Sequence, residues 1–250
     1  MDTRLPVPLV SDLPAEIDQL ARRYRRANGP VMRLANRLGG KLEAQLALVP
    51  GPYRAHLERA TAQALEAAYG FAGRTPDLGE RGPLVAVMAA GAAGGAGGLA
   101  TSLAELPVTV TLILNAIRAV AAEAGLDPDA DWVRGECLQV FGAGSPLSSD
   151  DGINTSFLTA RLTITGSAVQ NLIATVAPKL AAVLGQKLAA QAVPVIGAVS
   201  GAALNAAFLG YYREIARIRF ALLRLGEHHG VEAVLDAFRL AVEPPKIRQA

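Results

Sequence analysis

The chain has 250 residues, of which 51% are hydrophobic and 18% charged, and its mean hydropathy is +0.29. These values exclude an intrinsically disordered chain, which needs low hydrophobicity and high charge. A net charge of +2 gives no broad basic field for nucleic acid, and a single cysteine excludes a disulfide framework and a cysteine-based zinc site. So apolar a chain must bury its apolar surface or offer it to lipid or to a partner.

The hydrophobic period, interrupted by prolines and glycines, predicts helices along the chain and no strand. We expect them at about 12–27, 31–49, 53–71, 84–103, 107–124, 127–141, 153–185, 187–226 and 230–241. Asp127 is expected to cap the sixth helix, because Pro128 follows in its first turn. Kinks are expected at Pro178 and Pro194. The expected fold class is all-α, a single multi-helix bundle with N-terminal basic amphipathic helices (1–75) continuous with a helical core (76–242).

Two Ala/Gly-rich stretches, residues 82–122 and 162–212, carry few charges and are predicted to form apolar helical hairpins. Their length invites a transmembrane assignment, but the small side chains, the prolines and the missing aromatic belt argue against a plain span. Small residues recur at a spacing of four, which places them on one helix face: Gly91/Gly95, Gly94/Gly98, Gly197/Gly201 and Ala203/Ala207. Either these helices pack closely in a soluble bundle, or the hairpins insert into lipid or cradle it.

The first two expected helices combine apolar stripes with a strongly basic face. Between residues 19 and 42 there is no acidic residue, and the seven positive charges are Arg22, Arg23, Arg25, Arg26, Arg33, Arg37 and Lys41. A basic face opposite an apolar stripe suits an anionic membrane surface. The alternative is an ordinary solvated helix face.

Three patterns resemble functional motifs and fail in context. Residues 91–97 match the glycine fingerprint of short-chain dehydrogenases, but about eighty helical residues precede them and no Tyr-x-x-x-Lys pair exists. Residues 127–131 resemble a calcium loop but lack its glycine and its final glutamate. Adjacent His228 and His229 cannot grip one metal from one helix face. Cys137 lies in an apolar segment and is expected to be a core thiol.

Three blocks of sequence carry a family resemblance. They are GAAGGAGGL from Gly91 with LPVTVT from Leu106; ECLQVF at 136–141; and RLTITG from Arg161 with KLAAQAVPVIGA from Lys187, GAALN at 201–205 and ARIRF at 216–220. In these blocks, over about residues 82–226, the chain resembles the EcsC family. Glu105 stands where the family usually has Asp, and Phe157 where it often has Tyr. The resemblance implies an α-helical, membrane-associated or lipid-handling protein of a family without an established enzyme activity.

Polar groups inside the apolar segments mark a candidate ligand site. Lys187, Gln191 and Asn205 each need a partner in a helical core. That partner is either another helix, in which case the hydrogen bonds set the helix register, or the polar head of an amphiphile. The residues expected to line a lipid or ligand pocket are Gly91, Gly95, Pro107, Lys187, Gln191, Pro194, Gly197, Gly201 and Asn205.

The sequence therefore predicts a non-catalytic, membrane-associated or lipid-binding helical protein. It is expected in the cytoplasm, peripheral on the cytoplasmic face of the membrane, with membrane lipid, an amphiphile or a membrane protein complex as partner. No nucleic acid, cofactor, metal or catalytic residue is expected. The first alternative is an interaction module that docks a membrane transporter complex. The second is an enzyme with a site near Glu105, Asp150 and Asp151.

Overall fold

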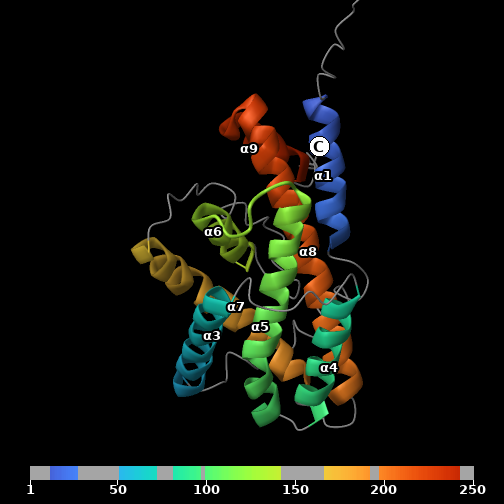
Figure 1. Ribbon diagram of the computed structural model, residues 1–250. Helices are drawn as coiled ribbons and strands as arrows, with labels where there is room; N and C mark the ends of the chain where they lie inside the picture. The colour runs from blue at the N-terminus through green and yellow to red at the C-terminus, as the bar shows by residue number, and fades with distance from the viewer. Residues whose placement is uncertain are drawn as a thin grey trace, which may run out of the picture.

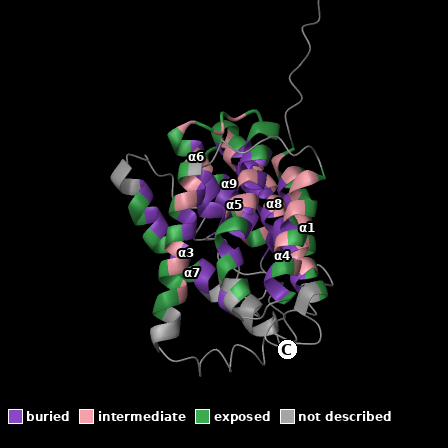
Figure 2. Cartoon of the chain, turned by 60° about the horizontal axis from the view of Figure 1, so that its bottom comes forward, coloured by how far each residue is buried: buried purple, intermediate pink, exposed green. Residues whose placement is uncertain are grey.

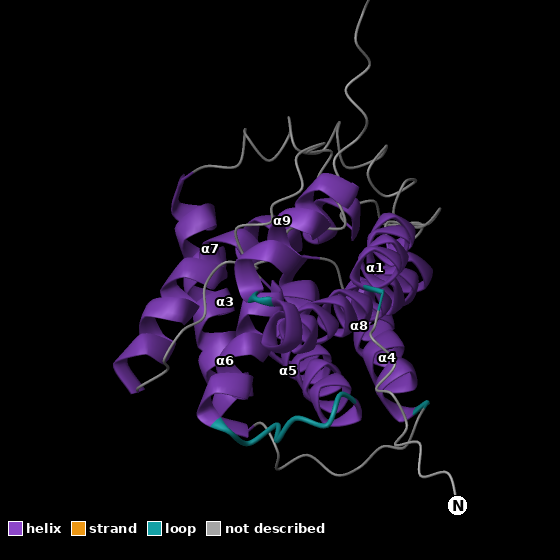
Figure 3. Cartoon of the chain, turned by 90° about the horizontal axis from the view of Figure 1, so that it is seen from above, coloured by secondary structure: helices purple, strands orange, loops and turns teal. Residues whose placement is uncertain are grey.

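The computed structural model describes residues 12–27, 51–71, 81–96, 99–141, 166–191 and 197–242. These residues form helices and no strand (Figure 3), which confirms the prediction of an all-α helical bundle. The described helices are α1 (Leu13–Ala27), α3 (Gly51–Phe71), α4 (Gly82–Ala96), α5 (Leu99–Glu123), α6 (Asp131–Val140), α7 (Gly166–Gln191), α8 (Gly197–His229) and α9 (Val231–Val242). The helix expected at about 31–49 lies outside the described residues.

Helix α8 is the central element of the bundle (Figure 1). Its N-terminal half packs against α4 and α5, and its C-terminal half packs against α1 and α9. Helix α3 packs on α5 and α7, and α6 fills the space between α5, α7 and α8. The long α8 thereby joins the Ala/Gly-rich end of the molecule to the end that carries the N-terminal helix.

The prediction that a helix begins at Pro107 is wrong. Helix α4 ends at Ala96, and α5 runs from Leu99 through Pro107 to Glu123. Proline has no N–H, so the carbonyl four residues before Pro107 lacks its helical hydrogen-bond partner. Because Pro107 is exposed, that carbonyl lies on the solvent side of α5, where water can bind it. The residues expected to form one helix at about 84–103 therefore belong to two described helices, α4 and α5.

The prediction that Asp127 caps a helix is also wrong. Helix α6 begins at Asp131, after Ala130 in extended conformation. The Asp127 side chain instead accepts a hydrogen bond from the main-chain nitrogen of Asp129, at 2.9 Å. This turn uses up the capping oxygen before the helix starts. The helix therefore begins later than its composition suggests.

Two helices end at glycines with a positive φ angle. Gly125 follows α5 with φ 80°, and Gly230 separates α8 from α9 with φ 86°. Left-handed backbone of this kind is strained for residues with a side chain and free for glycine. The predicted ends of these two helices therefore lie close to the observed ones.

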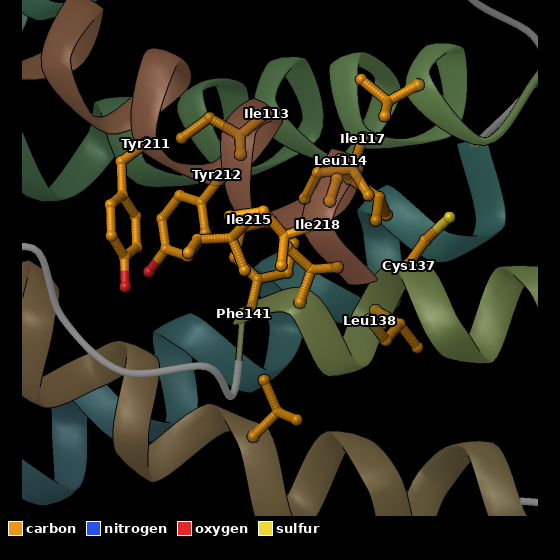
Figure 4. Packing of buried hydrophobic residues seen from close by; sticks show 14 of the residues in the cluster. Ile113, Leu114, Ile117, Cys137, Leu138, Phe141, Tyr211, Tyr212, Ile215 and Ile218 are labelled. Atoms are coloured by element: carbon orange, nitrogen blue, oxygen red, sulfur yellow. The ribbon is translucent and has the colours of Figure 1, made fainter. Parts of the chain in front are cut away.

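The buried core joins α5, α6 and α8 (Figure 4). The ring of Phe141, just after α6, packs on Tyr212 of α8 with centroids 5.0 Å apart. Cys137 is fully buried in the same cluster, as expected of a core thiol. On α8, every seventh residue from Asn205 through Tyr212 to Arg219 is a polar side chain that is buried almost completely. A spacing of seven keeps these three groups on one face of the helix.

Among the described residues, one stretch is long and apolar enough to cross a membrane by length and composition, at Ala104–Glu123 in α5. Its mean hydropathy is 1.4, but 61% of its most apolar 18-residue window is buried inside the bundle. The core helix of a globular protein has the same two properties. This stretch therefore does not by itself indicate a membrane span.

Candidate functional site

A stripe of small residues holds α4 against α8 and α5. The buried residues of α4 are Val87, Gly91, Gly94 and Gly95. A Cβ atom at Gly91 would lie 2.3 Å from the main-chain oxygen of Gly201 on α8. A Cβ atom at Gly94 would lie 2.3 Å from Oε2 of Glu105 on α5. Glycine at these positions lets the helix backbones approach more closely than any other residue would allow.

Polar side chains complete this helix junction. Asn205 Nδ2 on α8 donates to the main-chain oxygen of Val87 at 2.8 Å and to Glu105 Oε1 at 2.6 Å. The hydroxyl of Thr109 also donates to Glu105 Oε1, and Thr101 donates to the main-chain oxygen of Gly94 at 2.7 Å. Burial excludes competing water from Asn205, Glu105 and Thr109. The junction therefore fixes the register of three helices.

The opposite face of α4 is apolar and exposed (Figure 2). The helix contains no charged residue over its whole length. Its three largest outward side chains, Leu84, Val85 and Met88, are 40%, 64% and 38% exposed. Ala89, Ala93 and Ala96 continue this face toward the C-terminal end of α4. We call Leu84, Val85, Met88 and these three alanines the α4 face.

The distribution of side-chain size on α4 is the reverse of that in an ordinary surface helix. A surface helix of a water-soluble protein turns its large apolar residues inward and polar residues outward. Helix α4 instead turns three glycines and a single larger residue, Val87, inward, and Leu84, Val85 and Met88 outward. Helices that pack inside a lipid bilayer have this arrangement, with small residues between helices and large apolar residues toward lipid.

Comparison with known proteins places this junction in a family. The sequence model of the EcsC protein family matches residues 83–225, which is more than half of the chain. The chain belongs to the EcsC family. The matched region runs from the start of α4 into the C-terminal half of α8, and so includes the whole junction. No curated protein and no solved structure matches the chain.

The structure brings together some of the predicted pocket residues of this EcsC chain and not others. Gly91, Gly201 and Asn205 meet at the junction, where Asn205 serves as an inter-helix hydrogen-bond donor. Its Oδ1 has no hydrogen-bond partner among the described residues. Gly95 is buried on the same stripe, whereas Pro107 faces solvent. Gly197 is the first residue of α8. The side chains of Lys187 and Gln191, near the end of α7, are not described, and Pro194 lies outside the described residues.

The predicted basic face is described only for its first four arginines, on α1. Arg22 pairs with Asp18 on its own helix at 2.5 Å. Arg23 donates from Nε and Nη2 to the two carboxylate oxygens of Glu214 on α8, at 2.6 and 3.1 Å. Arg25 donates to the main-chain oxygen of Ala241 at 2.8 Å. Arg26 is exposed, and Arg33, Arg37 and Lys41 lie outside the described residues.

A second buried polar cluster was not predicted as a site. The Arg219 guanidinium on α8 donates to Glu136 and, at 2.6 Å, to Gln139 Oε1, both on α6. All three residues are buried. Burial lowers the pKa of Arg219, against the raising effect of the Glu136 charge. The sequence signal was the pair of charged residues inside otherwise apolar family blocks, at 136–141 and 216–220.

The acids and histidines reveal no further site within the described residues. No group of three or more His, Cys, Asp or Glu that could hold a metal ion exists there. Glu105 is buried in the helix junction, where Thr109 and Asn205 donate to it. Asp150 and Asp151 lie outside the described residues.

Proposed function

We propose that this EcsC protein is a non-catalytic, peripheral membrane protein of the cytoplasm that binds lipid bilayers through the α4 face. The observation that carries the proposal is the reversed size distribution of α4. A glycine stripe occupies its protein side, and Leu84, Val85 and Met88 occupy its outer side. Contiguous exposed apolar residues on a folded protein indicate a surface that another apolar phase covers.

The size of the face is consistent with reversible binding. From the exposed fractions of Leu84, Val85 and Met88, transfer of this surface from water to hydrocarbon is worth about 3 kcal/mol. That free energy corresponds to roughly a hundredfold preference for the membrane. The rest of the fold keeps its charged residues and stays in water, so the protein lies on the bilayer and does not cross it.

Vesicle co-sedimentation tests the proposal. Wild-type protein should pellet with vesicles of phosphatidylcholine and phosphatidylserine, and the Val85→Asp variant should stay in the supernatant. Val85 is exposed, so the substitution should leave the fold intact. The matched control is Leu240→Asp on α9, which charges an equally exposed apolar residue elsewhere and should bind as wild type does.

Equal binding by wild type, Val85→Asp and Leu240→Asp would reject the α4 face. A different result would favour the alternative that the same face docks a membrane protein complex. In that case wild type would not bind pure lipid vesicles but would bind native membranes, and Val85→Asp would not bind native membranes.

A further inference from the structure

We propose that the α4 face recognises electrically neutral phospholipid bilayers, and that the arginines of α1 add little to this binding. This inference rests on the proposed function, because it names the class of lipid that the same surface takes. It differs from the expectation drawn from the basic N-terminal sequence, which favours anionic lipid.

The first reason is the charge of the binding surface itself. Over residues 81–96 the one charged side chain is Arg81. Arg81 is exposed, and its main-chain oxygen accepts the N–H of Val85 at 3.1 Å, so it lies one helical turn before Val85 on the same side of α4. From there its long side chain reaches the phosphate level while the apolar residues enter the hydrocarbon. The phosphate that it meets is present in neutral and anionic phospholipids alike.

The second reason is that three of the α1 arginines already have partners within the protein. Arg22, Arg23 and Arg25 are engaged by Asp18, Glu214 and the carbonyl of Ala241, respectively. The Arg23 pair is bidentate and half-buried, so a lipid phosphate would have to displace two existing hydrogen bonds to Glu214. The Arg23 charge is therefore poorly available to a membrane surface, and at Arg22 and Arg25 a lipid phosphate would compete with an existing partner.

The third reason is position along α8. Helix α4 contacts α8 at Gly201 and Asn205, whereas α1 contacts it at Glu214. Nine residues of helix separate Asn205 from Glu214, a rise of about 13 Å. The α1 arginines are therefore displaced along α8 from the α4 face and do not form part of it.

Vesicle composition and salt test the inference. Binding is measured by co-sedimentation with phosphatidylcholine vesicles and with vesicles that also contain 30% phosphatidylserine, at about 50 and 300 mM NaCl. A single arginine near an anionic surface is worth about fivefold in binding, so phosphatidylserine should raise wild-type binding by no more than that. A variant with glutamine at Arg22, Arg25, Arg26, Arg33, Arg37 and Lys41 should bind phosphatidylcholine as wild type does.

The outcomes separate this inference from the proposed function. Binding to pure phosphatidylcholine that Val85→Asp abolishes, and that salt does not weaken, supports both. Binding that requires phosphatidylserine and disappears in the glutamine variant overturns the inference and leaves membrane association in place. No binding to either kind of vesicle overturns both.

Discussion

Asn205 on α8 donates a hydrogen bond from Nδ2 to the main-chain oxygen of Val87 on α4, at 2.8 Å, across 118 residues of sequence. The same nitrogen lies 2.6 Å from Glu105 Oε1. A donor at this position is therefore required by two oxygens at once. This contact and the glycine stripe beside it determine how α4 sits on the bundle, and hence which side chains α4 presents outward.

Asn205→Asp should destabilise the protein strongly. The substitution keeps the size of the side chain and places an oxygen, whichever way it rotates, where the Nδ2 donor now faces two acceptors. We expect a loss of about 3 kcal/mol or more in the free energy of unfolding, measured by urea denaturation. The control is Asn171→Asp on the exposed surface of α7, which should change stability by no more than about 0.5 kcal/mol. Equal effects of the two variants would mean that the junction has no special role.

Gly91→Ala should destabilise the fold, and Gly210→Ala should stabilise it. A methyl group at Gly91 would lie 2.3 Å from the Gly201 carbonyl oxygen, a main-chain atom that cannot rotate away. Separation of α4 from α8 should cost about 1–3 kcal/mol. At Gly210, also in a helix, a Cβ would meet nothing within 4 Å, so alanine should add about 0.5–1 kcal/mol. A stable Gly91→Ala protein with unchanged thermal unfolding would contradict the close approach of the two helices.

Removal of either partner of the buried ion pair should be costly. Arg219→Ala leaves the Glu136 carboxylate buried without its guanidinium, and we expect a loss of about 3–5 kcal/mol. Arg239 pairs with Asp236 at 3.1 Å on the exposed surface of α9, and Arg239→Ala should cost less than about 1 kcal/mol. A double-mutant cycle with Glu136→Gln should show strong coupling for the buried pair. Additive single effects would contradict the contact.

Stability should depend on pH through Glu214. Burial disfavours its charged form, but the hydrogen bond and charge of Arg23, with help from Arg217, outweigh burial, so the pKa of Glu214 lies below its ordinary value. The native state therefore releases this proton more readily than the unfolded chain, whose glutamates titrate near pH 4.3. The stabilisation is complete above that pH and disappears as the pH falls through the lower native pKa.

The measurement is the difference in free energy of unfolding between wild type and Glu214→Gln from pH 7 to pH 3. Wild type should be the more stable protein at pH 7, and the difference should shrink toward pH 3. A difference that grows as the pH falls would contradict the sign of the shift.

The Cys137 thiol should be unreactive in the native protein. Burial raises the pKa of this thiol to about 12, and the residue is fully buried, so neither thiolate nor access is available at neutral pH. A chromogenic disulfide reagent at pH 7.5 should modify it only after denaturation, with one thiol per chain. Modification within seconds in native buffer would show that the α5–α6–α8 core opens readily.

Local sequence signals predicted most helix ends but misplaced the starts of α5, α6 and α8; the last is expected at about residue 187, yet α7 continues to Gln191 and α8 begins at Gly197. The chain leaves α5 and α8 through left-handed backbone at Gly125 and Gly230. Residues with a side chain disfavour this conformation, so a glycine there indicates a helix end. Pro107 has the composition of a helix start, yet it lies within α5 on an exposed face that tolerates it. Asp127 has the composition of a cap, but its oxygen bonds within a preceding turn. The local preference of proline and aspartate for helix starts was therefore outweighed, at Pro107 by an exposed position within α5 and at Asp127 by a hydrogen bond within the preceding turn.

The candidate site could be predicted only in outline. The spacing of Gly91 and Gly95 indicated close packing of small residues, and such packing exists on α4. Which face would then be left exposed depends on the position of α8, more than a hundred residues further on. The partners of the charged residues could not be predicted either, because they lie far apart in the sequence. Arg23 and Glu214 are 191 residues apart, and Arg219 and Glu136 are 83 residues apart.

The depth of one side chain in a bilayer tests membrane binding through α4 most directly. A Val85→Cys variant can be labelled with an environment-sensitive fluorophore while Cys137 stays protected in the core. On addition of phosphatidylcholine vesicles, its emission should rise and shift to the blue, whereas a label at Leu240→Cys on α9 should not change. An unchanged spectrum at position 85, in protein that does pellet with the vesicles, would contradict binding through the α4 face.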